Sequence, residues 1–111
     1  MTVASVKEEQ GKIVVALEGD IDLENAGDVR KALLSSLKQK KDLLVDMSGV
    51  DYIDSSGIAS LVEGLQVARK QKNELSLVSV SPRARRVLEL ARLDKVFTIH
   101  ADVAAALAAQ P

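Results

Sequence analysis

The sequence predicts an α/β fold in which a mixed, mostly parallel sheet of about five strands is covered by about four helices. Two strand-like segments come first, at residues 1–9 and 13–17, and suggest an antiparallel hairpin. Segments with helical spacing of apolar residues then alternate with short apolar runs. Such helix–strand units are joined by right-handed crossovers and produce parallel strand pairing. The length of 111 residues fits one domain, expected over residues 1–111.

The first strand, residues 1–9, should be half-buried through Val3 and Val6, and a tight reversal at residues 10–12 leads into the β-branched run 13–17. A helix is predicted over residues 23–39. Asp22 is placed to cap it, and Glu24 would lie in its positively polarised first turn. Four apolar residues at helical spacing predict its buried face: Ala26, Val29, Leu33 and Leu37.

Residues 43–46 form a short apolar run of the kind found in a central parallel strand. A loop over residues 47–54 should connect it to a second helix over residues 56–71. The apolar stripe of that helix consists of Ile58, Leu61, Val62, Leu65 and Ala68. A third parallel strand is expected at residues 75–78.

Ser81 and Pro82 predict the start of a third helix, because Ser is favoured at the N-cap and Pro at the first helical position. Val87, Leu88 and Ala91 are expected on its inner face. A short last strand at residues 96–99 and an Ala-rich helix at residues 101–109 complete the prediction.

Composition excludes several classes of function. The absence of cysteine removes disulfides, thiolate catalysis and Cys-based metal sites. A net charge of −1 and only two aromatic residues argue against nucleic-acid binding. The single histidine, His100, is expected to end a strand or cap the last helix. Residues 1–10 lack the features of a secretory signal, and no apolar run approaches the ~20 residues of a membrane span, so we expect a cytoplasmic location without membrane insertion.

In sheets of this class, functional residues gather in loops after the carboxyl ends of strands, here residues 19–22, 47–56 and 79–82. Residues 1–55 hold eleven acidic and seven basic residues, whereas the remainder holds five and eight. The acids near the first two loops are Asp20, Asp22, Glu24, Asp28, Asp51 and Asp54, and the arginines on the third helix are Arg83, Arg85, Arg86 and Arg92. Two solvated faces would explain this pattern, and so would an acidic end that docks a protein by electrostatic complementarity.

Asp46 ends a buried strand, which is where phosphoaspartyl proteins place their acceptor. Asp46, Asp51 and Asp54 could together hold a hard cation. An Asx-type bond that turns the chain off the strand is the better reading of Asp46. We therefore expect no metal, no cofactor and no enzymatic activity.

Residues 54–57 carry the most informative motif. Ser55 or Ser56 is expected to cap a helix N-terminus, and Gly57 would allow close packing. A helix N-terminus also stabilises an anion through its free N–H groups and its dipole. A phosphoserine here would add about −1.5 to −2 charges beside Asp54 without unfolding the helix. Such a modification would switch binding rather than fold.

At this point the sequence resembles the STAS domain family, and within it the bacterial anti-sigma factor antagonists. The resemblance covers nearly the whole chain and rests on segments in the family's order. DYIDSSGI at 51–58 is similar to the family's Asp-Ser-Ser/Thr-Gly box, and LEGDID at 17–22 to its Gly-Glu-Leu-Asp turn. Further matches are LLVDMS at 43–48, VSVSP at 78–82 with Val87 and Leu88, and LDKVF at 93–97.

The resemblance implies a single STAS-like domain that acts as a partner switch. The unphosphorylated protein would bind an anti-sigma factor serine kinase, be released on phosphorylation, and be reset by a PP2C-type phosphatase. The implied phosphoacceptor is Ser55. Asp20, Asp22, Asp54, Ser56 and Gly57 would shape the partner-binding surface. The match departs at Ala59, where antagonists often have Gly, and this methyl could alter which partner fits.

Other STAS proteins are cytoplasmic subunits of phospholipid-transporting ABC systems, which bind the transporter's ATPase, or scaffolds of stress-signalling complexes. Those branches often lose the serine, so the presence of Ser55 favours the phosphoswitch. Residues 58–61 and the arginine-rich third helix leave the transporter alternative open.

Overall fold

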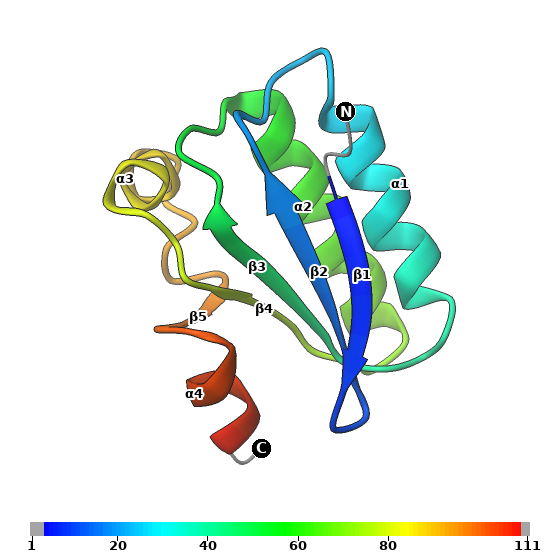
Figure 1. Ribbon diagram of the computed structural model, residues 1–111. Helices are drawn as coiled ribbons and strands as arrows, with labels where there is room; N and C mark the ends of the chain where they lie inside the picture. Colours follow the sequence, from blue (N-terminus) through cyan, green and yellow to red (C-terminus); the bar gives the residue numbers. More distant parts are fainter. Residues whose placement is uncertain (1–3, 110–111) are drawn as a thin grey trace.

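The computed structural model describes residues 4–109, which form five strands and four helices in one α/β unit (Figure 1). The strands lie in the order β1-β2-β3-β4-β5; β1 is antiparallel to β2, and the other pairs are parallel. This confirms the predicted mixed sheet. The elements are β1 Ala4–Glu9, β2 Lys12–Glu18, α1 Ala26–Leu37, β3 Leu43–Gly49, α2 Ser55–Lys70, β4 Leu75–Val78, α3 Pro82–Leu90, β5 Thr98–His100 and α4 Val103–Ala108.

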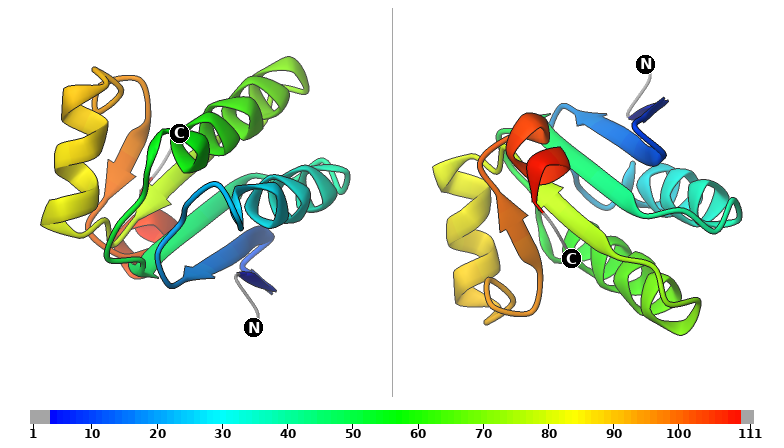
Figure 2. Two further views of the ribbon diagram at one scale, coloured as in Figure 1. Left: turned by 90° about the horizontal axis from the view of Figure 1, so that it is seen from above. Right: turned by 90° about the horizontal axis from the view of Figure 1, so that it is seen from below.

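The helices cover the two faces of the sheet unequally (Figure 2). The first three, α1, α2 and α3, pack on one face around the larger hydrophobic cluster, which includes Val15, Val45 and Leu77. The short α4 covers the other face, where its Ala106 packs with Val14, Leu44 and Val78. The central strands are therefore apolar on both sides, as their sequences predict.

The β1–β2 hairpin turns at Gln10 and Gly11, whose φ angles are +50° and +81°. Positive φ at both central positions matches the twist of the strands, and Gly reaches it without strain. Val3 belongs to the predicted first strand but lies outside the described residues. Val6 is 52% exposed, against the expected burial, because β1 is an edge strand.

The helix predicted over residues 23–39 is shorter than expected. Asn25, not Asp22, is its N-cap residue, and α1 starts at Ala26. The N–H groups of Asn25 and Ala26 both bond to the carbonyl oxygen of Asp22, so the preceding residues form a separate turn. The predicted inner face is correct, since all four of its apolar residues are buried.

Several other boundaries also differ from the prediction. Strand β3 continues to Gly49, because Glu18 and Gly49 still pair across β2 and β3. In α3 Leu88 and the half-buried Val87 pack on the core as predicted, together with Ala84. Ala91 is exposed at the C-cap, and Arg92 lies beyond the helix.

The last two elements are shifted relative to the predicted ranges. The N–H groups of Val96 and Phe97 bond to the carbonyl of Leu93, so the last strand begins only at Thr98. Asp102 caps α4, which starts at Val103, and His100 ends β5.

Candidate functional site

The loops that follow β2 and β3 lie side by side at the carboxyl edge of the sheet, at the top of Figure 1. Ile21 and Ile53 form an isolated parallel bridge between them. The N–H of Ile21 donates to the carbonyl of Tyr52 at 2.9 Å, and the N–H of Asp54 donates back to the carbonyl of Ile21 at 3.0 Å. Both isoleucines are fully buried. The two loops, residues 19–25 and 50–54, are therefore joined into one surface, called the platform below.

Asp54 is the cap of α2, so the prediction that Ser55 or Ser56 caps this helix is wrong. Oδ1 of Asp54 accepts the backbone N–H groups of Ser56 at 2.9 Å and of Gly57 at 3.2 Å. It also accepts the Ser56 hydroxyl at 2.6 Å. A carboxylate accepts these N–H groups as a hydroxyl would, and its charge also interacts favourably with the positive end of the helix.

These bonds lower the pKa of Asp54 below its ordinary value. The Ser56 hydroxyl has the largest effect, and the backbone N–H groups of Gly57, Ser56 and Leu23 lower the pKa further, whereas desolvation opposes them. Asp54 is therefore ionised at neutral pH. The site carries a fixed negative charge immediately before the two serines.

The neighbouring serines differ in their surroundings. Ser55 is the first residue of α2 and is exposed, and its hydroxyl has no hydrogen-bond partner within residues 4–109. Ser56 is half-buried and engaged by Asp54. Ser60 is buried, and its hydroxyl donates to the carbonyl oxygens of Ala26 at 2.9 Å and of Ser56 at 3.3 Å. Of these three hydroxyls, the one on Ser55 is the one open to an incoming reagent.

Gly57 lets α2 pack against the two loops. A Cβ atom on Gly57 would come within 2.6 Å of Cγ2 of Ile21 and of Cγ1 of Ile53. Real Cβ atoms do not approach other atoms so closely, and in this packed interior the neighbours would have to shift. The glycine is thus required for the helix to begin against the Ile21–Ile53 bridge.

The loop at residues 20–25 is held by Asn25, which the sequence analysis did not single out. The N–H of Asp22 donates to Oδ1 of Asn25 at 2.8 Å, and Nδ2 of Asn25 donates to the carbonyl of Asp20 at 2.7 Å. Oδ1 of Asp22 accepts the N–H of Glu24 at 3.0 Å. The preference of Asn and Asp for turns was the available signal. Asp20 and Asp22 are thereby positioned on the same platform as Asp54.

The segment before Asp54 is joined to α3 by Arg83. Its Nη1 lies 3.3 Å from Oδ2 of Asp51, and its guanidinium carbon lies 5.3 Å from the centre of the Tyr52 ring. Both ends of this ion pair are largely exposed, so its contribution to stability is small. At least one arginine of the basic helix thus neutralises part of the acidic end rather than forming a separate patch.

The three aspartates considered for a cation have separate roles. Oδ1 of Asp46 accepts the N–H of Ser48 at 3.0 Å in an Asx-type bond, although the strand continues past it. Asp51 faces Arg83, and Asp54 caps α2. Among residues 4–109, no three His, Asp or Glu side chains lie close enough to share a metal ion.

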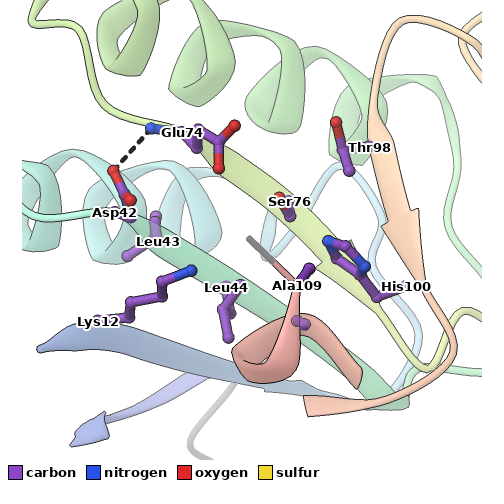
Figure 3. A pocket seen from close by; sticks show the side chains of 10 residues that line it. Lys12, Asp42, Leu43, Leu44, Glu74, Ser76, Thr98, His100 and Ala109 are labelled. Carbon is purple, nitrogen blue, oxygen red and sulfur yellow. Dashed lines mark hydrogen bonds between the residues drawn. The ribbon is translucent and has the colours of Figure 1, made fainter. Parts of the chain in front are cut away.

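A separate cavity of about 200 Å³ lies beside α4 (Figure 3). Lys12 and Asp42, near the amino ends of β2 and β3, line it together with Ser76 and His100. None of the predicted site residues lines this cavity, since the platform is at the carboxyl ends of the same strands.

No helix within residues 4–109 combines the length and apolar character needed to cross a membrane.

Comparison with known proteins identifies the family. The STAS domain pattern matches residues 4–106, so the chain belongs to the STAS domain family. It is 30% identical over 96 residues to the anti-sigma-B factor antagonist of Bacillus subtilis (strain 168), covering 86% of this chain and 88% of that protein. Anti-sigma factor antagonists are non-enzymatic regulators, in agreement with the prediction that this chain is not an enzyme.

Two solved structures have the same fold over nearly all of the chain. The anti-sigma factor antagonist from Mycobacterium paratuberculosis is 27% identical, with a TM-score of 0.85 over 94% of this chain and 89% of that one. The anti-sigma factor antagonist (STAS) domain protein from Planctomyces limnophilus is 25% identical, with a TM-score of 0.86 over 96% of both chains. These similarities agree with the resemblance seen in the sequence.

Proposed function

We propose that this chain is a partner-switching regulator of transcription that acts in the cytoplasm. Unphosphorylated, it binds an anti-sigma factor serine kinase and so frees the sigma factor; phosphorylation of Ser55 releases the kinase. The observation that carries the proposal is the exposure of Ser55 at the start of α2, next to Asp54, which caps the helix and is ionised. Membership among the anti-sigma factor antagonists supports it.

The proposed reaction is phosphoryl transfer from ATP. The Ser55 hydroxyl oxygen attacks the γ-phosphorus, the bond from that phosphorus to the ADP oxygen breaks, and the hydroxyl proton passes to a base of the kinase. Phosphoserine and ADP result. A PP2C-type phosphatase returns the serine by hydrolysis, with inorganic phosphate as the second product. This chain supplies the acceptor hydroxyl and its presentation.

The phosphate would change the surface while the fold persists. Two backbone N–H groups of the first turn, those of Ser56 and Gly57, already bond to Asp54, so little of the helix N-terminus is left to neutralise the new anion. A phosphoserine adds about −1.5 to −2 charges and considerable volume. Enclosing that charge in an interface shaped for a hydroxyl is costly, because an unpaired anion must be desolvated. The kinase is therefore released.

The test uses the chain with Ser55→Ala and Ser55→Asp as baits in cytosol of the native organism, with mass spectrometry of the prey and of phosphate on the wild type. A serine kinase held by Ser55→Ala and released by Ser55→Asp supports the proposal. Ser35→Asp is the matched control. Ser35 is exposed in the last turn of α1, so this substitution adds the same charge away from the platform. It should retain the kinase.

Two results would contradict the proposal. Equal retention of an ABC-transporter ATPase by all baits would make this chain a transporter subunit and Ser55 an ordinary helix residue. Loss of cooperative unfolding in Ser55→Asp would show that this position is needed for the fold, so that release could not be read as switching.

A further inference from the structure

Leu23 is an exposed leucine held in a defined position. It is 81% exposed in the turn that precedes α1. The residues on both sides are tied down: the N–H of Asp22 bonds to Asn25 at 2.8 Å, and the N–H of Glu24 bonds to Asp22 at 3.0 Å. Its exposure is therefore not explained by a loose loop. The turn presents an apolar side chain to solvent.

Leu23 lies on the same pair of joined loops that leads into the phosphoacceptor. Ile21 and Ile53 pair in parallel, and Leu23 and Ser55 each follow their isoleucine by two residues. The N–H of Asp54 donates to the carbonyl of Ile21 at 3.0 Å, and the backbone N–H of Leu23 contributes to the lowered pKa of Asp54. A partner that covers the two joined loops before α1 and α2 therefore faces Leu23 as well.

The sequence around Leu23 is acidic. Asp20, Asp22 and Glu24 flank it, and no Lys or Arg occurs between residues 13 and 29. A partner that covers this loop must accommodate a leucine and face these carboxylates. Apolar side chains at the centre of an interface contribute most of the affinity, and charges at the rim contribute to specificity and association rate.

We infer that Leu23 is the apolar anchor of the kinase-docking surface, and that the partner receives it in an apolar pocket rimmed by basic side chains. This inference rests on the proposed function and adds to it the residue that supplies binding energy next to the modified serine. Ser55 is then the residue whose phosphorylation releases the partner, while Leu23 contributes the binding energy.

The test is a calorimetric titration of the purified kinase that the Ser55→Ala bait retains. Leu23→Ser and Leu90→Ser are made in the Ser55→Ala background. Leu90 is the matched control, since it is 79% exposed at the end of α3 and is not on the platform. Leu23→Ser should weaken Kd at least tenfold, Leu90→Ser less than twofold, and Leu23→Met should restore Kd to within about threefold. Midpoints of thermal unfolding should agree among all variants.

The possible outcomes separate this inference from the function on which it rests. If Leu23→Ser binds like its parent while Ser55→Asp still releases the kinase, the switch stands and the anchor is wrong. Equal weakening by Leu23→Ser and Leu90→Ser also overturns the anchor. If Ser55→Ala retains no kinase, the proposed function fails and the inference with it. Raising the salt from 50 to 300 mM shortens the Debye length from about 14 to about 6 Å. An affinity that does not fall over this range would contradict the basic rim of the partner's pocket.

Discussion

The hydroxyl of Ser56 donates a 2.6 Å hydrogen bond to the carboxylate of Asp54. This bond gives two adjacent serines different roles. Ser56 helps to hold the cap of α2, while Ser55, one residue earlier, remains exposed. The same carboxylate oxygen satisfies the first turn of the helix. The cap thus secures the start of α2 without using the serine proposed to be modified.

Removing the Asp54 carboxylate should destabilise the fold. Asp54→Ala leaves the N–H groups of Ser56 and Gly57 without their acceptor and the Ser56 hydroxyl without its partner. Loss of an N-cap of this kind should lower Tm by roughly 5 °C in a domain of this size. Ser55→Ala is the control, because the exposed hydroxyl has no partner among the described residues, and its Tm should change by less than about 2 °C. Thermal unfolding followed by circular dichroism measures both; equal Tm values for the two variants would contradict this account of the cap.

The contribution of Asp54 should depend on pH. Its pKa is lowered in the folded state, chiefly by the Ser56 hydroxyl, so its stabilisation is fully present above the unfolded-state pKa of about 4. It is lost as the pH falls through the lower folded-state pKa. Urea unfolding of wild type and Asp54→Asn from pH 7 to pH 3 should therefore give a gap that narrows below about pH 4.

The titration of Glu63 also affects the acid stability of the wild type. The hydrogen bond from Arg30 also lowers the pKa of Glu63, so the wild type loses stability with acid for a second reason. The comparison with Asp54→Asn cancels this effect, because both proteins keep the Arg30–Glu63 pair. A gap that stays constant to pH 3 would show that Asp54 acts as a cap independently of its charge.

Gly57→Ala should destabilise the protein, whereas Gly27→Ala should not. A methyl group at residue 57 would overlap Ile21 and Ile53, and overpacking of this kind typically costs about 1–3 kcal/mol. Gly27 lies in α1 with no atom within 4 Å of a new Cβ, so Ala there should stabilise by about 0.4–1 kcal/mol. Urea denaturation gives both values. Similar losses from the two substitutions would contradict the close packing at residue 57.

The buried Ser60 hydroxyl should contribute to the contact between α1 and α2. Ser60→Ala removes its 2.9 Å bond to the carbonyl of Ala26 and should cost about 1 kcal/mol. Ser35→Ala, on an exposed part of α1, should stay within about 0.5 kcal/mol of wild type. If Ser60→Ala is as stable as Ser35→Ala, the hydrogen bond contributes nothing net.

Local patterns predicted most of the architecture. The alternation of apolar runs and helical stripes predicts a mixed, mostly parallel sheet, because each short strand is too apolar to remain exposed and each crossover has one favoured hand. The order of the strands comes from the structure. The third helix starts where Ser81 and Pro82 predict, since this signal depends only on adjacent residues. Boundaries such as the start of α1 were missed, because Asn25 and Asp22 bond to each other in a preceding turn.

The sequence by itself determined the fold class, the family resemblance and the serine-containing box, since these depend on periodicity and on neighbours along the chain. Only the tertiary structure decided how the box works. The Ile21–Ile53 bridge brings two loops about thirty residues apart into contact and places Leu23 beside Asp54. The carboxylate of Asp54 caps α2, because it accepts two N–H groups of the first turn and its charge interacts favourably with the helix dipole. The Ser56 hydroxyl donates to this carboxylate, and the Ser55 hydroxyl is left exposed.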